Sequence, residues 1–168
     1  KISLFRCKTN HLKTVIKKLE HCGCKFEYSQ NFLRIIPNQI LNSVHITTSP
    51  FPGFPTDLQA PFMALMATAN GTSEIKETVF ENRMHHVKEL NRMGAKITVR
   101  DNIAKVIGVK KLQGREVIGS DLRATAALAI AGLSANGKTI VKGLEHLERG
   151  YENFSEKFQE IGASILKK

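Results

Sequence analysis

The chain has 168 residues, of which 42% are hydrophobic, and its 25 Lys and Arg residues against 15 Asp and Glu residues give a formal charge of +10. This composition suits one soluble domain with a sizeable core, and the longest apolar stretch, residues 124–133, is about half of what spans a bilayer. The charge favours an anionic partner. Because aromatic residues make up only 7% and no basic stripe alternates with stacking residues, we expect no nucleic-acid groove and no membrane contact.

The hydrophobic periodicity predicts helices and strands in a recurring order. Residues 1–44 predict a sheet and a helix whose apolar face carries Leu12, Val15, Ile16 and Leu19. In residues 45–115 we expect a strand at 45–47, a helix from Asp57 to Asn70-Gly71, a strand at 73–77, a helix at 84–93, and a hairpin of 95–99 with 103–108 that turns at 100–102. Residues 116–168 predict a helix from Asp121 to Asn136-Gly137 and a later helix with an apolar face of Tyr151, Phe154, Phe158 and Ile161.

The segments 45–115 and 116–168 are copies of one unit that reads β-α-β-α-β-β. Their polar landmarks match in order and at a nearly constant offset: Asp57 with Asp121, Asn70-Gly71 with Asn136-Gly137, Arg83 with Arg149, and Gly94 with Gly162. Residues 1–44 form an incomplete third copy, in which Gly23 corresponds to Gly94. Apolar matches alone would indicate a shared core, whereas a doubled aspartate and a doubled arginine indicate a site assembled by pseudo-symmetry.

The doubled residues have a structural and a functional interpretation. Asp57 and Asp121 each begin a helix, a position typical of an N-cap, yet a carboxylate that faces a cleft can also take a proton from a hydroxyl within hydrogen-bond reach. Arg83 and Arg149 would by default be solvated, but guanidinium groups also grip carboxylate or phosphate at two points. Arg123 would add another such group at a helix N-terminus, where backbone N–H groups favour anions.

The cysteines and the paired histidines predict no metal site. Cys7, Cys22 and Cys24 are odd in number and lack framework spacing, which favours a reducing compartment. In the repeat, Cys22 corresponds to Met93 and Ile161, so we expect it to be a core residue. We expect His85-His86, which has no carboxylate in H-E-x-x-H spacing, to be a solvated pair.

Four segments resemble the signatures of the UDP-N-acetylglucosamine enolpyruvyl transferases, also called UDP-N-acetylglucosamine 1-carboxyvinyltransferases. They are residues 51–59 (FPGFPTDLQ), 77–83 (ETVFENR), 121–124 (DLRA) and 149–152 (RGYE). The resemblance implies an α+β fold, the α/β prism or inside-out α/β barrel of enolpyruvyl transferases and RNA cyclases, in which three β-α-β-α-β-β units pack helices inward and sheets outward. Residues 1–168 would be most of one of that enzyme's two domains.

The resemblance also implies a cytoplasmic enzyme without a cofactor. It would transfer the enolpyruvyl group of phosphoenolpyruvate to the 3-hydroxyl of UDP-N-acetylglucosamine, through a tetrahedral intermediate that eliminates phosphate, in the first committed step of peptidoglycan synthesis. By similarity, Asp57 would be the base at the sugar hydroxyl and Asp121 would line the reaction centre. Arg123 and Arg149 would clamp phosphoenolpyruvate, with support from Arg83.

The resemblance also implies a contact with the substrate, and the chain departs from the family pattern at one residue and in what it lacks. The backbone around Val79 and Phe80 would help to hold the UDP-sugar. Met84 stands where the family pattern has Phe, which affects packing more than chemistry. The family's proton-donating cysteine belongs to the second domain, so we expect the isolated chain to be inactive and its missing partner to be that domain.

Two other interpretations stay open from the residues. A shikimate-pathway enolpyruvyl transferase would share the fold and would act on shikimate 3-phosphate, although the segment 51–57 speaks against it. A binding module related to the RNA cyclases would bind RNA with a steep salt dependence. Because the first copy lacks a helix like the one that begins at Asp57, we also expect an apolar surface on residues 1–36 that self-associates or is covered by a longer chain.

Overall fold

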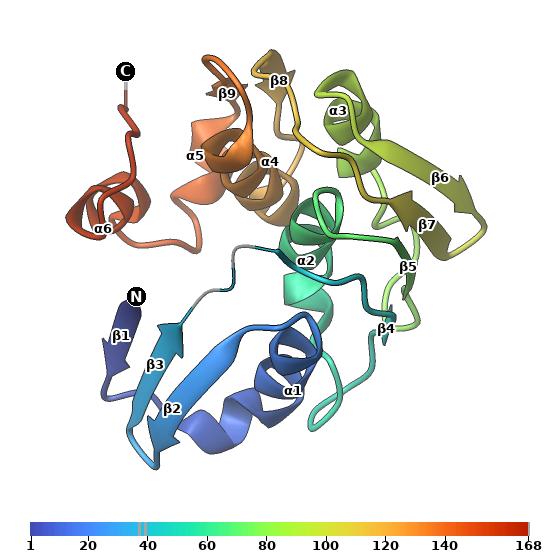
Figure 1. Ribbon diagram of the computed structural model, residues 1–168. Helices are drawn as coiled ribbons and strands as arrows, with labels where there is room; N and C mark the ends of the chain where they lie inside the picture. Colours follow the sequence, from blue (N-terminus) through green and yellow to red (C-terminus); the bar gives the residue numbers. More distant parts are fainter. Residues whose placement is uncertain (37, 39, 168) are drawn as a thin grey trace.

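A computed structural model describes residues 1–36, 38 and 40–167, and its elements follow the repeating order (Figure 1). The first unit contains β1 (Ile2–Phe5), η1 (Thr9–Leu12), α1 (Lys13–His21), β2 (Lys25–Ser29) and β3 (Phe32–Ile36). The second contains β4 (Ile46–Thr47), η2 (Thr56–Leu58), α2 (Gln59–Met66), β5 (Thr72–Lys76), α3 (His86–Arg92), β6 (Lys96–Arg100) and β7 (Ile103–Ile107). The third contains β8 (Glu116–Ile118), α4 (Leu122–Ser134), β9 (Ile140–Lys142), α5 (Leu144–Leu147) and α6 (Phe154–Glu160).

The sheets repeat one strand arrangement. In the first unit the order β1-β3-β2 is antiparallel throughout, and the second unit repeats it as β5-β7-β6, with Ile75 opposite Ala104 and Val106 opposite Ile97. A parallel strand, β4, joins the free edge of β5, and β8 pairs with β9 in the same parallel way. The described part of the third unit shows no strand after α6, so its sheet holds only β8 and β9.

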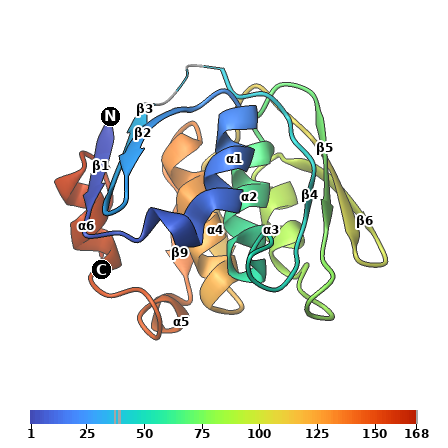
Figure 2. The ribbon, with the colours of Figure 1, turned by 90° about the horizontal axis from the view of Figure 1, so that it is seen from below.

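The helices lie on the inside of this arrangement. Figures 1 and 2 show α1, α2, α3 and α4 grouped together, with the β5–β7–β6 sheet on one side and the first sheet on another. Nearly every side chain of α2 is buried, including Phe62, Met63 and Met66, because a helix that is apolar all round must be covered on all sides. The expected α+β fold with inward helices is therefore confirmed, and the described strands form three separate sheets.

The predicted elements are confirmed with bounds that are shorter or shifted by a few residues. The helix expected from Asp57 begins as the 3₁₀ turn η2, and its α-helical part ends four residues before Asn70. The hairpin turns at Asp101-Asn102, where Asp101 adopts a left-handed φ of 54°. Gly71 has a φ of 104°, and a Cβ there would lie 2.6 Å from the Ser43 hydroxyl, so this position requires glycine.

The first and third units have less complete cores than the second. On α1, Ile16 is buried while Val15 and Leu19 pack partly against the core, as expected. In the third unit, Phe154 is buried beside Ala126 and Leu147, but Ile161 is 51% exposed, so its expected place on the apolar face is wrong. It lies just beyond the end of α6, where the chain leaves the helical path.

The sheet of the first unit exposes apolar side chains, as the incomplete repeat predicts. Phe5 is 72% exposed and Tyr28 is 57% exposed, and the Phe5 ring stands 5.3 Å from that of Phe32. Whether a second copy or further chain covers this surface stays a prediction. Among the described residues, no helix combines the length and apolar composition needed to cross a membrane.

Replacing Leu128 on α4 with alanine will destabilise the protein strongly. The side chain is completely buried in the core, so its removal leaves a cavity that costs about 2–5 kcal/mol of unfolding free energy. Leu133→Ala on the same helix is the matched control, because Leu133 is 42% exposed. Urea unfolding followed by circular dichroism measures both, and equal losses would contradict the assignment of α4 to the core.

Candidate functional site

Asp57 lies between two arginines that come from different repeat units. Its Oδ1 accepts a hydrogen bond of 2.6 Å from Arg123 Nε and also pairs with Arg123 Nη2. Arg83 Nη1 lies 3.6 Å from the same oxygen. The Asp57 side chain is 65% exposed, whereas those of Arg83 and Arg123 are 19% and 30% exposed. The structure thus brings together two residues that the doubled pattern selected, Asp57 and Arg83, and the helix-start arginine Arg123.

Asp57 does not cap its helix. The residues that flank η2 and α2 at their N-terminal ends are Pro55 and Leu58, and neither end has a side-chain cap. The structural interpretation of Asp57 as an N-cap is therefore wrong. A 3₁₀ turn places the carboxylate beyond the helix, where it faces Arg123 instead of backbone N–H groups.

Asp121, its counterpart in the third unit, does cap a helix. Its Oδ1 accepts hydrogen bonds from the backbone N–H groups of Arg123 and Ala124, at 2.9 and 3.1 Å, and Ser120 donates to Oδ2. Burial acts to raise the pKa of Asp121, but these hydrogen bonds outweigh it and hold the pKa below its usual value. The carboxylate therefore stays ionised at the N-terminus of α4, and its place at the reaction centre stays a prediction.

Arg83 is held from two further directions. Its Nη1 donates to the Thr56 hydroxyl at 3.3 Å, and its guanidinium carbon lies 4.0 Å from the centre of the Phe80 ring. Phe80 is itself 51% exposed, so the ring covers one face of the guanidinium while its own outer face stays open. These contacts fix Arg83 beside Asp57 without an ion pair of ideal length.

A buried carboxylate that the sequence interpretation missed lies behind these groups. Glu77 is 2% exposed and its Oε1 accepts hydrogen bonds from the Thr48 hydroxyl at 2.7 Å and from the backbone N–H groups of Val79 and Phe80 at 2.8 and 3.2 Å. Its Oε2 accepts from the Thr56 hydroxyl at 2.9 Å. Strand alternation could have revealed it, because Ser73, Ile75 and Glu77 fall on the inward face of one strand.

The surroundings of Glu77 favour its ionised form. Burial acts to raise the pKa of this carboxyl, but four hydrogen bonds to its oxygens outweigh burial and hold the pKa below the usual range of glutamate. A carboxylate without such donors would be costly at this depth.

The segment after β5 turns its backbone donors inward. Thr78 N donates to the Thr48 hydroxyl at 2.9 Å, and the next two amides, those of Val79 and Phe80, donate to Glu77. The contact with the UDP-sugar that the resemblance implies for the backbone around Val79 and Phe80 stays a prediction, and these two amides are already engaged by Glu77. Beside them is a hollow of about 280 Å³ whose lining includes Phe80, Arg83 and Val99.

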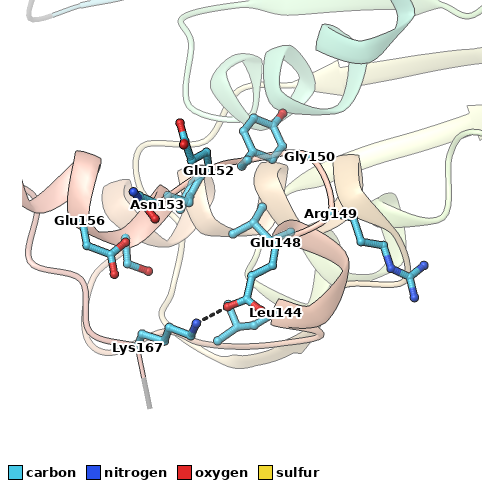
Figure 3. Close-up of a pocket in the computed structure, with 12 residues that line it drawn as sticks. Leu144, Glu148, Arg149, Gly150, Glu152, Asn153, Glu156 and Lys167 are labelled. Atoms are coloured by element: carbon cyan, nitrogen blue, oxygen red, sulfur yellow. Dashed lines mark hydrogen bonds and ion pairs between the residues drawn. The ribbon is translucent and has the colours of Figure 1, made fainter.

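Arg149 stays apart from this group. It is exposed and lines a larger hollow, of about 620 Å³, around α5 and α6 (Figure 3). Figure 3 shows its guanidinium directed away from Lys167 and Glu148, which form an ion pair. Among the described residues, no hydrogen bond or ion pair joins Arg149 to Asp57, so its role in clamping an anion stays a prediction.

Tyr151, two residues after Arg149, is partly buried and packs its ring against that of Phe154. Burial raises the pKa of the Tyr151 phenol, and the negative charge of Asp57 raises it further, while Arg123 acts in the opposite direction. Gly150, which lies between Arg149 and Tyr151, packs so closely that a Cβ there would lie 2.9 Å from Leu122.

The two adjacent histidines differ, and the expected solvated pair is wrong for one of them. His85 is exposed, but His86 is 3% exposed on the inner face of α3 with Val87 and Leu90. Burial lowers the pKa of His86 to about 4, although the charge of Asp121 acts to raise it. Helix periodicity explains the error, because residues 86, 87 and 90 share one face while residue 85 lies outside it.

Core packing near the site agrees with the expectations for Met84 and for Cys22. Met84 packs against the core, and its sulfur accepts a hydrogen bond from the buried Gln59. Cys22 is fully buried, as expected, and Cys24 is partly buried. In the part of the chain that the structure describes, no group of three or more His, Cys, Asp or Glu residues could hold a metal ion.

Known proteins resemble this chain in both sequence and fold. The family model for EPSP synthase (3-phosphoshikimate 1-carboxyvinyltransferase) matches residues 1–158. The chain is 59% identical over 155 residues to UDP-N-acetylglucosamine 1-carboxyvinyltransferase 2 of Prochlorococcus marinus, and the match covers 92% of this chain and 36% of that protein. It is 51% identical over 164 residues to the UDP-N-acetylglucosamine 1-carboxyvinyltransferase of Thermodesulfovibrio yellowstonii, covering 98% and 39%. The chain thus spans a little over a third of these curated relatives.

Solved structures give the same picture. The enolpyruvyl transferase NikO from Streptomyces tendae superposes with a TM-score of 0.86 at 26% identity, covering 96% of this chain and 39% of NikO. EPSP synthase from Acinetobacter baumannii superposes with a TM-score of 0.68 at 16% identity, covering 93% and 37%, and this likeness shows the fold alone.

The two repeat-related aspartates will differ in their effect on stability. Asp121→Ala removes a helix N-cap and should cost about 1 kcal/mol of unfolding free energy. Asp57→Ala removes only a half-exposed ion pair, worth less than about 1 kcal/mol, and should leave the melting temperature nearly unchanged. Differential scanning calorimetry compares the two, and a larger loss for Asp57→Ala would contradict the capping assignment.

Glu77 will make the stability fall in acid. Since folding lowers its pKa, the stability that it contributes is fully present above the unfolded value, about 4.3, and is lost as the pH falls through the lower folded value. Glu77→Gln should cost about 1–3 kcal/mol at pH 7, and the gap from wild type should shrink as the pH drops below about 4. Urea unfolding across pH 3 to 7 measures this. Glu74→Gln, an exposed change on the same strand, should show no gap at any pH.

Proposed function

Because the chain belongs to the EPSP synthase (3-phosphoshikimate 1-carboxyvinyltransferase) family, we propose that it is part of a larger enolpyruvyl transferase that acts on UDP-N-acetylglucosamine. The complete enzyme transfers the enolpyruvyl group of phosphoenolpyruvate to the 3-hydroxyl of this sugar nucleotide. The chain is most of one of two domains, and the second domain supplies the acid that protonates the substrate's methylene carbon.

The observation that carries this proposal is the Asp57 carboxylate between Arg83 and Arg123, within a chain 59% identical to a protein of that name. A carboxylate that is 65% exposed can reach a substrate hydroxyl and accept its proton. Guanidinium groups beside it can grip the carboxylate and phosphate groups of phosphoenolpyruvate at two points.

The residues then divide the reaction between them. Asp57 takes the proton as the sugar oxygen bonds to the enol carbon, and the second domain's acid adds a proton to the methylene carbon, which gives a tetrahedral intermediate. Loss of phosphate and of a methyl proton from this intermediate restores the double bond. Arg123 and Arg149 hold the phosphoenolpyruvate anion while Arg83 supports its charge, and such positioning contributes through orientation and charge stabilisation.

The remaining site residues orient the sugar nucleotide. Asp121 lines the reaction centre from the N-terminus of α4, where its hydrogen bonds keep it ionised. The carbonyl groups and side chains of Val79 and Phe80 contact the UDP-sugar. The enzyme requires no cofactor and works in the cytoplasm, where both substrates are available.

Asp57→Asn in the complete enzyme will lower turnover by about two to four powers of ten, because it removes the base and keeps the size of the side chain. The measurement is phosphate release from phosphoenolpyruvate that depends on UDP-N-acetylglucosamine. Glu160→Gln, a carboxylate-to-amide change on the exposed side of α6, is the control and should keep wild-type turnover. Near wild-type turnover of Asp57→Asn would refute the catalytic role, and release that depends on shikimate 3-phosphate instead would assign the chain to the shikimate-pathway reaction.

A further inference from the structure

Glu77 stands at the junction of three segments that the proposed site uses. Its carboxylate binds the end of β4 through Thr48, the turn η2 through Thr56, and the segment after β5 through the amides of Val79 and Phe80. Its own backbone is fixed as well, since Glu77 N donates to the Asn102 carbonyl and the Asn102 side chain donates to the Glu77 carbonyl. One buried side chain therefore determines where these segments lie relative to one another.

Thr56 transmits the position of Glu77 to the arginine beside Asp57. The Thr56 hydroxyl has one hydrogen, and an ionised Glu77 can only accept, so this hydrogen points at Glu77 Oε2. The oxygen lone pairs of the hydroxyl therefore face Arg83 Nη1, which donates to them at 3.3 Å. With the donors and acceptors in this order, Arg83 Nη1 lies 3.6 Å from Asp57 Oδ1.

We propose that Glu77 is a positioning residue of the transferase site: it fixes the backbone at Val79 and Phe80 and, through the direction of the Thr56 hydroxyl, holds Arg83 against Asp57. Its consequence for the reaction rests on the proposed function. Its consequence for the order of the segment does not, because the hydrogen bonds to Val79 and Phe80 exist without substrate.

A glutamine at position 77 would reverse one link of this chain. Three donors converge on Oε1, so the amide oxygen of a glutamine takes that place and its NH₂ group faces Thr56. The Thr56 oxygen then accepts from the NH₂ group, and its hydrogen loses the acceptor that directed it. The hydroxyl is no longer locked with its lone pairs toward Arg83, which weakens the hold on Arg83 beside Asp57.

Steady-state kinetics of the complete enzyme tests this link. Glu77→Gln should lower kcat/KM about 10- to 100-fold, as small displacements of positioned groups do. Thr56→Val should cause a similar loss, and Thr56→Ser, which keeps the hydroxyl, should stay within about threefold of wild type. Because the part of the Glu77→Gln loss that runs through the hydroxyl is already absent in Thr56→Val, the double variant Glu77→Gln/Thr56→Val should lose less than the product of the two single losses. Glu74→Gln, on the outer face of the same strand, should behave as wild type.

Independent losses would overturn the proposal. If the two single losses multiply in the double variant, or if Thr56→Ser is as impaired as Thr56→Val, Glu77 does not act through the hydroxyl. If Glu77→Gln fails to fold, the comparison of Thr56→Val with Thr56→Ser still decides, since neither variant removes the buried carboxylate.

Hydrogen exchange separates this inference from the proposed function. In the peptide that covers residues 78–83, Glu77→Gln should speed amide exchange about three- to tenfold, because a neutral acceptor replaces a charged one, while peptides of α2 and β7 keep their wild-type rates. Unchanged exchange in residues 78–83, or equal acceleration throughout the chain, would overturn the positioning role. If wild-type enzyme releases no phosphate with UDP-N-acetylglucosamine, the proposed function fails and exchange alone decides the role of Glu77.

Discussion

The packing of α2 against α4 is the constraint on which the rest of the structure depends. These two helices come from corresponding places in two repeat units, and small residues such as Ala60, Ala64, Ala124 and Ala127 are buried on them. Small side chains let two helices approach closely and share one core. The N-terminal ends of the two helices lie near each other, since Arg123 in the first turn of α4 reaches Asp57 in the turn η2 just before α2. The ion pair is thus a consequence of helix packing between units.

The duplicated aspartates show how a repeat acquires two roles from one residue type. Asp121 Oδ1 accepts hydrogen bonds from backbone N–H groups of α4, which stabilises the helix and holds the carboxylate in place. In the second unit, Pro55 and the turn η2 precede the helix, so Asp57 lies outside capping geometry. Its helix begins without a side-chain cap, and the carboxylate is left for a partner from another unit. A cap at one copy and an exposed carboxylate at the other are alternatives for the same position.

Local sequence patterns predicted most of the fold and about half of the site residues. Periodicity predicted the helices and strands, the doubled landmarks selected Asp57 and Arg83, and its place at a helix N-terminus selected Arg123. These three residues do meet. Strand alternation could have shown that Glu77 points inward, but its threonine partners, Thr48 and Thr56, lie 29 and 21 residues earlier in the chain, and no local pattern reports contacts of that range. The burial of His86 was missed for a different reason. Two adjacent histidines look alike in the sequence, but only His86 lies on the buried face of α3.

The charge of Glu77 follows from the number of donors around it. Four hydrogens, from two hydroxyls and two amides, point at one small buried volume. An amide side chain would present a donor to one of them, and an apolar side chain would leave all four unsatisfied, each at a cost of about 1–3 kcal/mol. Only a carboxylate accepts all four, and the same hydrogen bonds keep it ionised against burial. A strand end, a helix start and a loop that meet with their donors facing inward therefore require an acid at their centre, and the geometry of Arg83 beside Asp57 follows from that requirement.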